Sequence, residues 1–157
     1  MDGSIPVSFE FDSETATLVE FPDEQITATL ELARIGPRLF RIESVPFMIE
    51  TVGFGDVIEA DSVTNDALRF VRIAARGGWH TYDFLIPAEL IESENIAAIQ
   101  DRILSLGGHW ERVFGGILFL CLPPTSDYNP IEDMSNTPTI QNKAPGITGL
   151  HHQPPKP

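Results

Sequence analysis

Residues 79–122, WHTYDFLIPAELIESENIAAIQDRILSLGGHWERVFGGILFLCL, decide the fold that we expect from this sequence. The first eight of them suit a strand, which Pro87 ends. From Ser93 to Leu106 the apolar residues recur at the spacing of an amphipathic helix, with Ser93 as its N-cap and Gly107 as its stop. The stretch therefore begins as a strand followed by a helix.

Two more strands complete this pattern. Residues 109–114 and 117–122 flank the pair Gly115-Gly116, which is a two-residue hairpin signal. The second of these strands is apolar almost throughout, so we expect it in the centre of a sheet with both faces covered. A strand–helix–strand unit crosses over right-handed, which makes strands 79–86 and 109–114 parallel.

A short helix is expected after the hairpin. Asn129 is a suitable N-cap, and Pro130 suits the first helical position. The order strand, helix, strand, strand, short helix over residues 79–136 predicts a ferredoxin-like β-α-β-β-α half.

The residues before this half form short alternating stretches separated by turns, which predict a small curved antiparallel sheet or partial barrel. The expected strands are Val7–Phe11, Ile26–Leu32, Leu39–Ile42, Val57–Ala60 and Leu68–Ile73. The fold class is therefore α+β, with a single domain over residues 1–136. In residues 137–157 five of 21 positions are proline and almost nothing is periodic, which predicts a disordered tail.

The charge balance is strongly acidic. Twenty-three acids face ten bases, which gives a formal charge of −13. Such a surface repels phosphate backbones and disfavours nucleic-acid binding, whereas it would speed the encounter with a basic protein. The alternative is that the acidity only keeps the protein in solution.

Other features indicate the cellular compartment and whether a membrane, metal or cofactor is expected. The single cysteine, Cys121, lies in an apolar run and suits a reducing compartment. No signal peptide and no apolar stretch long enough to span a bilayer is present, so we expect a cytoplasmic protein with no membrane partner. His151 and His152 are adjacent without further ligands, and we expect no metal and no cofactor.

Two histidines mark the most specific candidate site. His80 and His109 each follow a glycine pair and adjoin a tryptophan, Trp79 and Trp110 respectively. If their strands are parallel, both lie at one end of the sheet, about 5 Å apart for paired strands and about 10 Å with one strand between them. Two imidazoles there could bind a ligand or carry a proton. The alternative is structural: glycines make the turn, and the aromatic side chain closes the core.

The carboxylates form no catalytic constellation. Asp56 follows Gly55 and is expected to bond its own backbone in an Asx turn. With Glu59 it is the acidic part of a candidate binding set whose other members are the two histidines and two tryptophans. The sequence has no phosphate loop, zinc-ligand spacing or nucleophile elbow, so we do not expect an enzyme.

Several short segments between positions 34 and 136 resemble the bacterial domain-of-unknown-function family 4265. These segments are Phe40-Arg41-Ile42, Val45-Pro46-Phe47, residues 53–60, residues 68–72, residues 77–81, Leu106-Gly107 and residues 120–124. The element Gly55-Asp56-Val57 is the most diagnostic. The resemblance implies a small bacterial α+β protein and supplies no activity, cofactor or catalytic residue.

The function that these features favour is an acidic protein-binding module. A bacterial immunity protein or inhibitor that occludes a basic toxin or enzyme is one concrete form, because occlusion needs complementary charge and a rigid face but no catalytic group. The alternative is a small-ligand binder or enzyme that uses His80 and His109 at one edge of the sheet.

Overall fold

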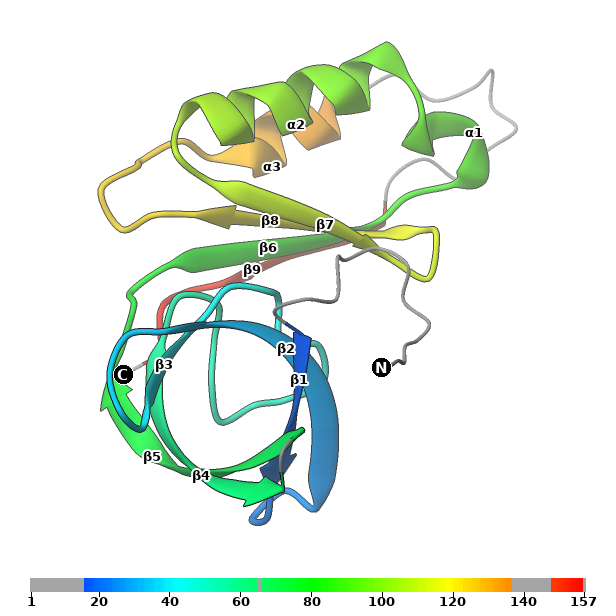
Figure 1. The fold of residues 1–157 in the computed structure, drawn as a ribbon. Helices are drawn as coiled ribbons and strands as arrows, with labels where there is room; N and C mark the ends of the chain where they lie inside the picture. Colours follow the sequence, from blue (N-terminus) through cyan, green and yellow to red (C-terminus); the bar gives the residue numbers. More distant parts are fainter. Residues whose placement is uncertain (1–15, 65, 137–147, 157) are drawn as a thin grey trace. The chain divides into compact units, whose positions relative to one another are not determined.

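A computed structural model describes residues 16–64, 66–136 and 148–156 of the chain (Figure 1). Its contacts divide the chain into two compact units. The first unit ends at Gly77 and also contains Lys156, and the second unit runs from Gly78 to Pro155. The sequence had suggested one domain over residues 1–136.

The first unit is a closed barrel of five strands in the order β1-β2-β3-β4-β5. Its strands are β1 (Ala16–Phe21), β2 (Ile26–Arg34), β3 (Leu39–Ile42), β4 (Val57–Thr64) and β5 (Ala67–Ala75). Neighbours along the chain pair antiparallel, and β1 closes the barrel by pairing parallel with β5. Closure satisfies the backbone groups that an open sheet would leave at its edges.

The barrel interior is filled by one side of each strand. In β2, Leu30 and Leu32 are buried while the residues between and beside them are more open, as the period-2 pattern predicts. They join Ile42, Ile58 and other apolar side chains in one core. The prediction of a small curved antiparallel sheet or partial barrel holds in its coarser form, because the barrel is closed and has one parallel pair. Strand β1 was not foreseen, and the expected strand at 7–11 lies outside the described residues.

Strand β5 departs from simple alternation. Arg69 and Arg72 are three positions apart, so a regular strand would place them on opposite faces, yet both are exposed. The pairing passes from Phe70 to Arg72 between consecutive β4 residues, which leaves Val71 as a bulge. The extra residue shifts the alternation, so both arginines reach the outer surface and bind acids: Arg69 binds Glu20, and Arg72 binds Glu59.

The second unit is a four-stranded sheet in the order β7-β8-β6-β9, with helices on one face (Figure 1). Its elements are β6 (His80–Leu85), α1 (Ala88–Ile91), α2 (Glu94–Ser105), β7 (His109–Val113), β8 (Ile117–Leu122), α3 (Pro130–Ser135) and β9 (Thr148–Gln153). Strand β8 is antiparallel to both β6 and β7, so these two strands are parallel with β8 between them. The parallel pair and the central apolar strand were both predicted.

Helix α2 begins and ends as its sequence indicates. The Ser93 Oγ accepts a hydrogen bond from the amide of Ile96 at 3.3 Å, and Gly107 has a φ of +81° just beyond the helix. Ile96, Ile99 and Ile103 form its buried stripe against the sheet. Helix α3 starts in the same way, because the Asn129 Oδ1 accepts from the Ile131 amide at 3.0 Å.

The β7–β8 hairpin differs from the expected two-glycine turn. Val113 pairs with Ile117, so the loop has Phe114, Gly115 and Gly116 in it. Phe114 and Gly115 take the positive φ values of 54° and 79°. A phenylalanine therefore occupies a left-handed position that glycine or asparagine fills more easily.

The tail also differs from expectation. Residues 148–153, predicted as part of a disordered segment, form β9 and pair antiparallel with β6. Without β9, the backbone N–H and C=O groups on that side of β6 would lack sheet partners. An added strand pairs with them through its own backbone, so its side chains need not follow a strand pattern. Residues 137–147 lie outside the described part of the chain. The α+β class is confirmed, while the ferredoxin-like description of this unit remains a prediction.

Candidate functional site

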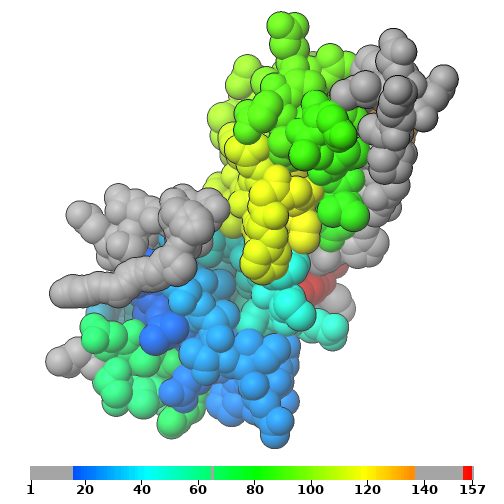
Figure 2. All heavy atoms as spheres, turned by 90° about the vertical axis from the view of Figure 1, so that its right-hand side faces the viewer, coloured from blue at the N-terminus to red at the C-terminus, as the bar shows by residue number. Residues whose placement is uncertain are grey.

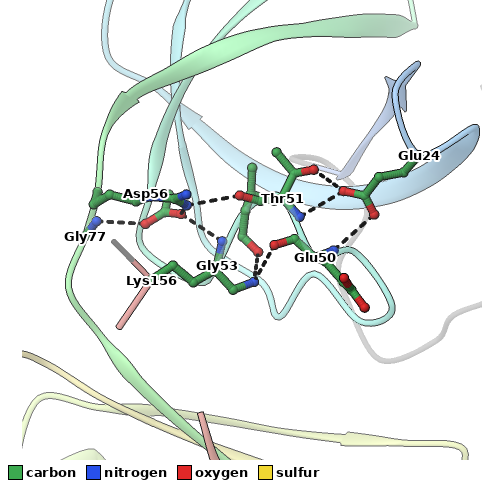
Figure 3. Close-up of polar contacts among 9 residues, drawn as sticks. Glu24, Glu50, Thr51, Gly53, Asp56, Gly77 and Lys156 are labelled. Atoms are coloured by element: carbon green, nitrogen blue, oxygen red, sulfur yellow. Dashed lines mark hydrogen bonds and ion pairs between the residues drawn. The ribbon is translucent and has the colours of Figure 1, made fainter. Parts of the chain in front are cut away.

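The most concentrated polar network in the barrel unit surrounds Asp56, which precedes β4 and is only 4% exposed. Its Oδ2 accepts hydrogen bonds from the Gly53 amide at 2.8 Å and from Arg76 Nη1 at 2.9 Å (Figure 3). Its Oδ1 accepts from the Gly77 amide at 2.8 Å. The carboxylate thus bonds a residue three positions before it and the segment after β5, in place of the predicted Asx turn. It fastens the loop before β4 to the end of β5.

Gly77 is required by close packing at this junction. A Cβ at this position would lie 2.4 Å from the carbonyl oxygen of Gly55 and 2.6 Å from its carbon. No side chain fits that space without moving the backbone, so glycine allows the two segments to approach closely enough for Asp56 to bond the Gly77 amide. The first of the two glycine pairs is therefore structural.

Glu24, in the turn between β1 and β2, holds the same loop from another side. Its Oε1 accepts from the Glu50 amide at 3.1 Å and its Oε2 from the Thr51 amide at 2.8 Å, and it also bonds the Thr51 hydroxyl (Figure 3). The hydroxyl of Thr51 lowers the pKa of Glu24 most, and the two backbone amides act in the same direction while burial opposes them. Hydrogen bonds to the ionised form are the cause.

Lys156 is bound to this loop through its side chain. Its Nζ donates to the carbonyl oxygens of Glu50 at 3.0 Å and Val52 at 2.8 Å (Figure 3). Burial lowers the pKa of Lys156, and Arg76 acts in the same direction, whereas the charges of Asp56, Glu24 and Glu50 raise it. We call the two carbonyl oxygens together with these three carboxylates the ammonium cradle.

The cradle binds a cation but has no reactive group of its own. Its members are two backbone carbonyls and three carboxylates, of which Glu24 and Asp56 are engaged by backbone amides. Arg76 lies beside it and donates to the Thr51 carbonyl at 3.0 Å. Within the part of the chain that the structure describes, no three His, Cys, Asp or Glu side chains come together to hold a metal. Nor does any helix in that part have the length and apolar character to cross a membrane.

The two acids of the predicted binding set are engaged within the barrel. Asp56 is buried, as described above. The side chain of Glu59 is 16% exposed and binds Arg38 at 2.8 Å and Arg72 at 2.6 Å. Their main roles are therefore contacts with their own unit.

The predicted histidine pair lies at one end of the sheet but does not share a face. Cys121 in the central strand β8 is paired with His109 of β7 and with Thr81 of β6. The side chains of these three residues therefore project from the same face of the sheet. His80 precedes Thr81 and projects to the other face, on the side of the sheet where Trp110 packs against the helix-side core. Trp79 stands just before β6 and is half-buried. The structure therefore does not bring the two imidazoles into one site.

The second glycine pair is structural in the same way as the first. A Cβ on Gly108 would lie 2.4 Å from the Cys121 carbonyl oxygen and 2.8 Å from the Ile103 side chain. His109 beyond it has a partner that the sequence analysis missed: its Nε2 lies 2.7 Å from the Glu111 Oε2, two residues on and on the same face. Cys121 is fully buried, and burial raises the pKa of its thiol well above the ordinary value, as its apolar run suggests.

The sequence analysis missed most of the cradle. Lys156 stands alone in a proline-rich stretch, and Glu24 occupies a turn far from it along the chain. The one available signal was Gly55-Asp56-Val57, because an aspartate among glycines often bonds nearby backbone amides.

Comparison with known proteins places the chain among its relatives. The family profile described as Domain of unknown function (DUF4265) matches residues 24–143, which is more than half of the chain. The chain belongs to this family. The match confirms the resemblance found in the sequence and extends it toward the N-terminus to include Glu24. No curated protein matches the chain.

The DUF4265 chain also resembles a solved structure. A hypothetical protein from Neisseria gonorrhoeae has a TM-score of 0.51 and 17% sequence identity with it, over 77% of this chain and 82% of that chain. At this identity the likeness concerns the fold alone.

Proposed function

We propose that this DUF4265 chain is an acidic protein-binding module that docks on a basic protein through the helical layer of its second unit. A bacterial immunity protein or inhibitor that occludes a basic toxin or enzyme in the cytoplasm is the concrete form that we favour. Occlusion requires a rigid, complementary face and no catalytic group.

The observation that carries the proposal is the set of exposed acids on and beside the helices of the second unit. Residues 78–136 contain nine acids and two arginines, whereas the described barrel strands and loops from 16 to 77 have ten acids and six arginines. Five of the six barrel arginines bind acids of their own unit, including Asp56, Glu59 and Asp61. In the second unit Arg112 binds Glu92. Over the full sequence the two units have similar net charges, −7 for the first (14 acids, 7 bases) and −6 for the second (9 acids, 3 bases). Within residues 16–136, acids outnumber arginines by seven in the second unit and by four in the barrel.

Most of these acids are on or beside the helices and are exposed. They are Glu89, Glu92, Glu94, Asp101, Asp127, Glu132 and Asp133. Figure 2 shows the green residues of the second unit, which include α1 and the start of α2, open at the surface. Helix α2 packs on the sheet through its buried isoleucines, so it holds two of these charges, Glu94 and Asp101, on a fixed frame.

A pair of variants with equal charge change tests the proposal. The helix variant combines Glu89→Gln, Asp101→Asn, Asp127→Asn and Glu132→Gln, all at exposed positions. The barrel variant makes the same change in net charge through Asp23→Asn, Glu43→Gln, Asp61→Asn and Asp66→Asn, also exposed. Each is immobilised and used to capture proteins from a bacterial lysate at low and high salt.

We expect wild type and the barrel variant to retain the same basic protein at low salt, and the helix variant to lose it. High salt should weaken capture by both binders because the attraction is screened over about 8–10 Å. Equal capture by the two variants, or capture that does not depend on salt, would contradict docking through the helical layer.

A further inference from the structure

The loop that forms the ammonium cradle is also held by contacts that do not involve Lys156. Glu24 bonds the amides of Glu50 and Thr51, and Asp56 bonds the amide of Gly53. Because these carboxylates hold the N–H groups of the loop, the loop conformation is fixed by contacts that do not involve Lys156. The carbonyl oxygens of Glu50 and Val52 are thereby aimed at one point, where the Lys156 Nζ lies.

The carboxylates around that point attract a cation, whereas burial, the largest effect on the pKa of Lys156, and Arg76 act against it. Asp56, Glu24 and Glu50 interact electrostatically with Lys156 as anions, and Arg76 as a cation. Without an ammonium group the cradle would have three negative charges against one positive charge. Two carbonyl acceptors converging on one atom suit the compact, three-donor ammonium of lysine better than the planar fork of arginine.

We propose that the ammonium cradle is a binding site for the side chain of a lysine, which Lys156 fills within the chain and which a lysine-bearing peptide fills when Lys156 is absent or displaced. The site belongs to the barrel unit and does not depend on docking by the acidic helices. Lys156 has an advantage over any external lysine because it is tethered, and a tethered ligand acts at an effective concentration in the millimolar range. The full chain should therefore bind an external lysine much more weakly than a chain that lacks Lys156.

The test uses a chain that ends at Gln153, the last residue of β9, and the full chain beside it. The probe is acetyl-Pro-Pro-Lys-amide, which copies residues 154–156, and the control is the same peptide with norleucine in place of lysine. Binding is followed by the NMR shifts of the Glu50, Thr51 and Gly53 amides. We expect saturable shifts with the lysine peptide in the shortened chain, binding at least about tenfold weaker in the full chain, and none with norleucine.

Two further variants keep the test decisive. If the shortened chain does not fold, Lys156→Ala in the full-length chain replaces it. Glu50→Gln in the chain that lacks Lys156 should weaken binding of the lysine peptide. The Glu50 side chain is exposed, so the substitution should not disturb folding, but it removes a negative charge that interacts with the bound ammonium. The proposal is overturned if the folded chain without Lys156 shows no saturable shift with the lysine peptide, or if the norleucine peptide binds it equally well. It is also overturned if this chain and the full chain bind the lysine peptide with the same affinity.

Discussion

Replacing Asp56 by alanine should destabilise the barrel unit by about 3 kcal/mol. The substitution removes the acceptor of two backbone amides, Gly53 and Gly77, and of the Arg76 guanidinium. Each buried donor left without a partner costs about 1–3 kcal/mol. We take the lower end for each amide because Gly53 and Gly77 are half-buried, and a smaller share for Arg76, whose side chain is 31% exposed and can turn to water.

Asp61→Ala is the matched control. Asp61 also binds an arginine, Arg38, but both side chains are 52% exposed. Exposed ion pairs of this kind contribute about 0–1 kcal/mol. The two substitutions remove the same functional group and differ mainly in its burial, so the difference between them measures the buried network.

The assay must distinguish the two units. Both tryptophans and both tyrosines, at positions 79, 110, 82 and 128, lie in the second unit, so their fluorescence reports on that unit alone. Unfolding of the barrel by urea is therefore followed by far-UV circular dichroism and by hydrogen exchange of the Gly53 and Gly77 amides. The role of Asp56 in holding the loop would be refuted if Asp56→Ala lowered the unfolding free energy no more than Asp61→Ala does. Unchanged hydrogen exchange at these two amides would refute it as well.

Three more predictions concern single positions. Gly108→Ala should lower the unfolding free energy of the second unit by about 2–3 kcal/mol, because the added Cβ overlaps the Cys121 carbonyl. Gly107→Ala, which has open space but a positive φ, should lower it by about 1 kcal/mol. Urea unfolding followed by tryptophan fluorescence measures both, and equal losses would contradict the prediction. Because the folded state lowers the pKa of Glu24 from 4.5, its contribution to stability is present above that pH and is lost as the pH falls through the folded pKa. Glu24→Gln should therefore reduce the loss of barrel stability with falling pH below about 4.5, measured by urea unfolding followed by circular dichroism. The same pH dependence as in the wild type would count against this role. Phe114→Asn should raise the stability of the second unit by up to about 1 kcal/mol, since asparagine tolerates the φ of 54°, and a lower urea midpoint would contradict this.

Local signals in the sequence were enough to place most elements of the fold. The limits of α2 follow from Ser93 and Gly107, whose effects act within one helical turn. The central position of β8 follows from its continuous apolar run, and the alternation in β2 predicted a barrel strand. The α+β class, the parallel pair of strands and the burial of Cys121 could all be read from such patterns.

The sites depended on tertiary structure. Asp56, Glu24 and Lys156 are far apart in the sequence, and only closure of the barrel and the path of the chain bring them to one loop. A single bulge in β5 decided which face Arg72 occupies, and pairing across β8 decided that His80 and His109 project to opposite faces. Periodicity describes contacts within a few residues, whereas register, bulges and chain closure are set by partners that no local pattern names.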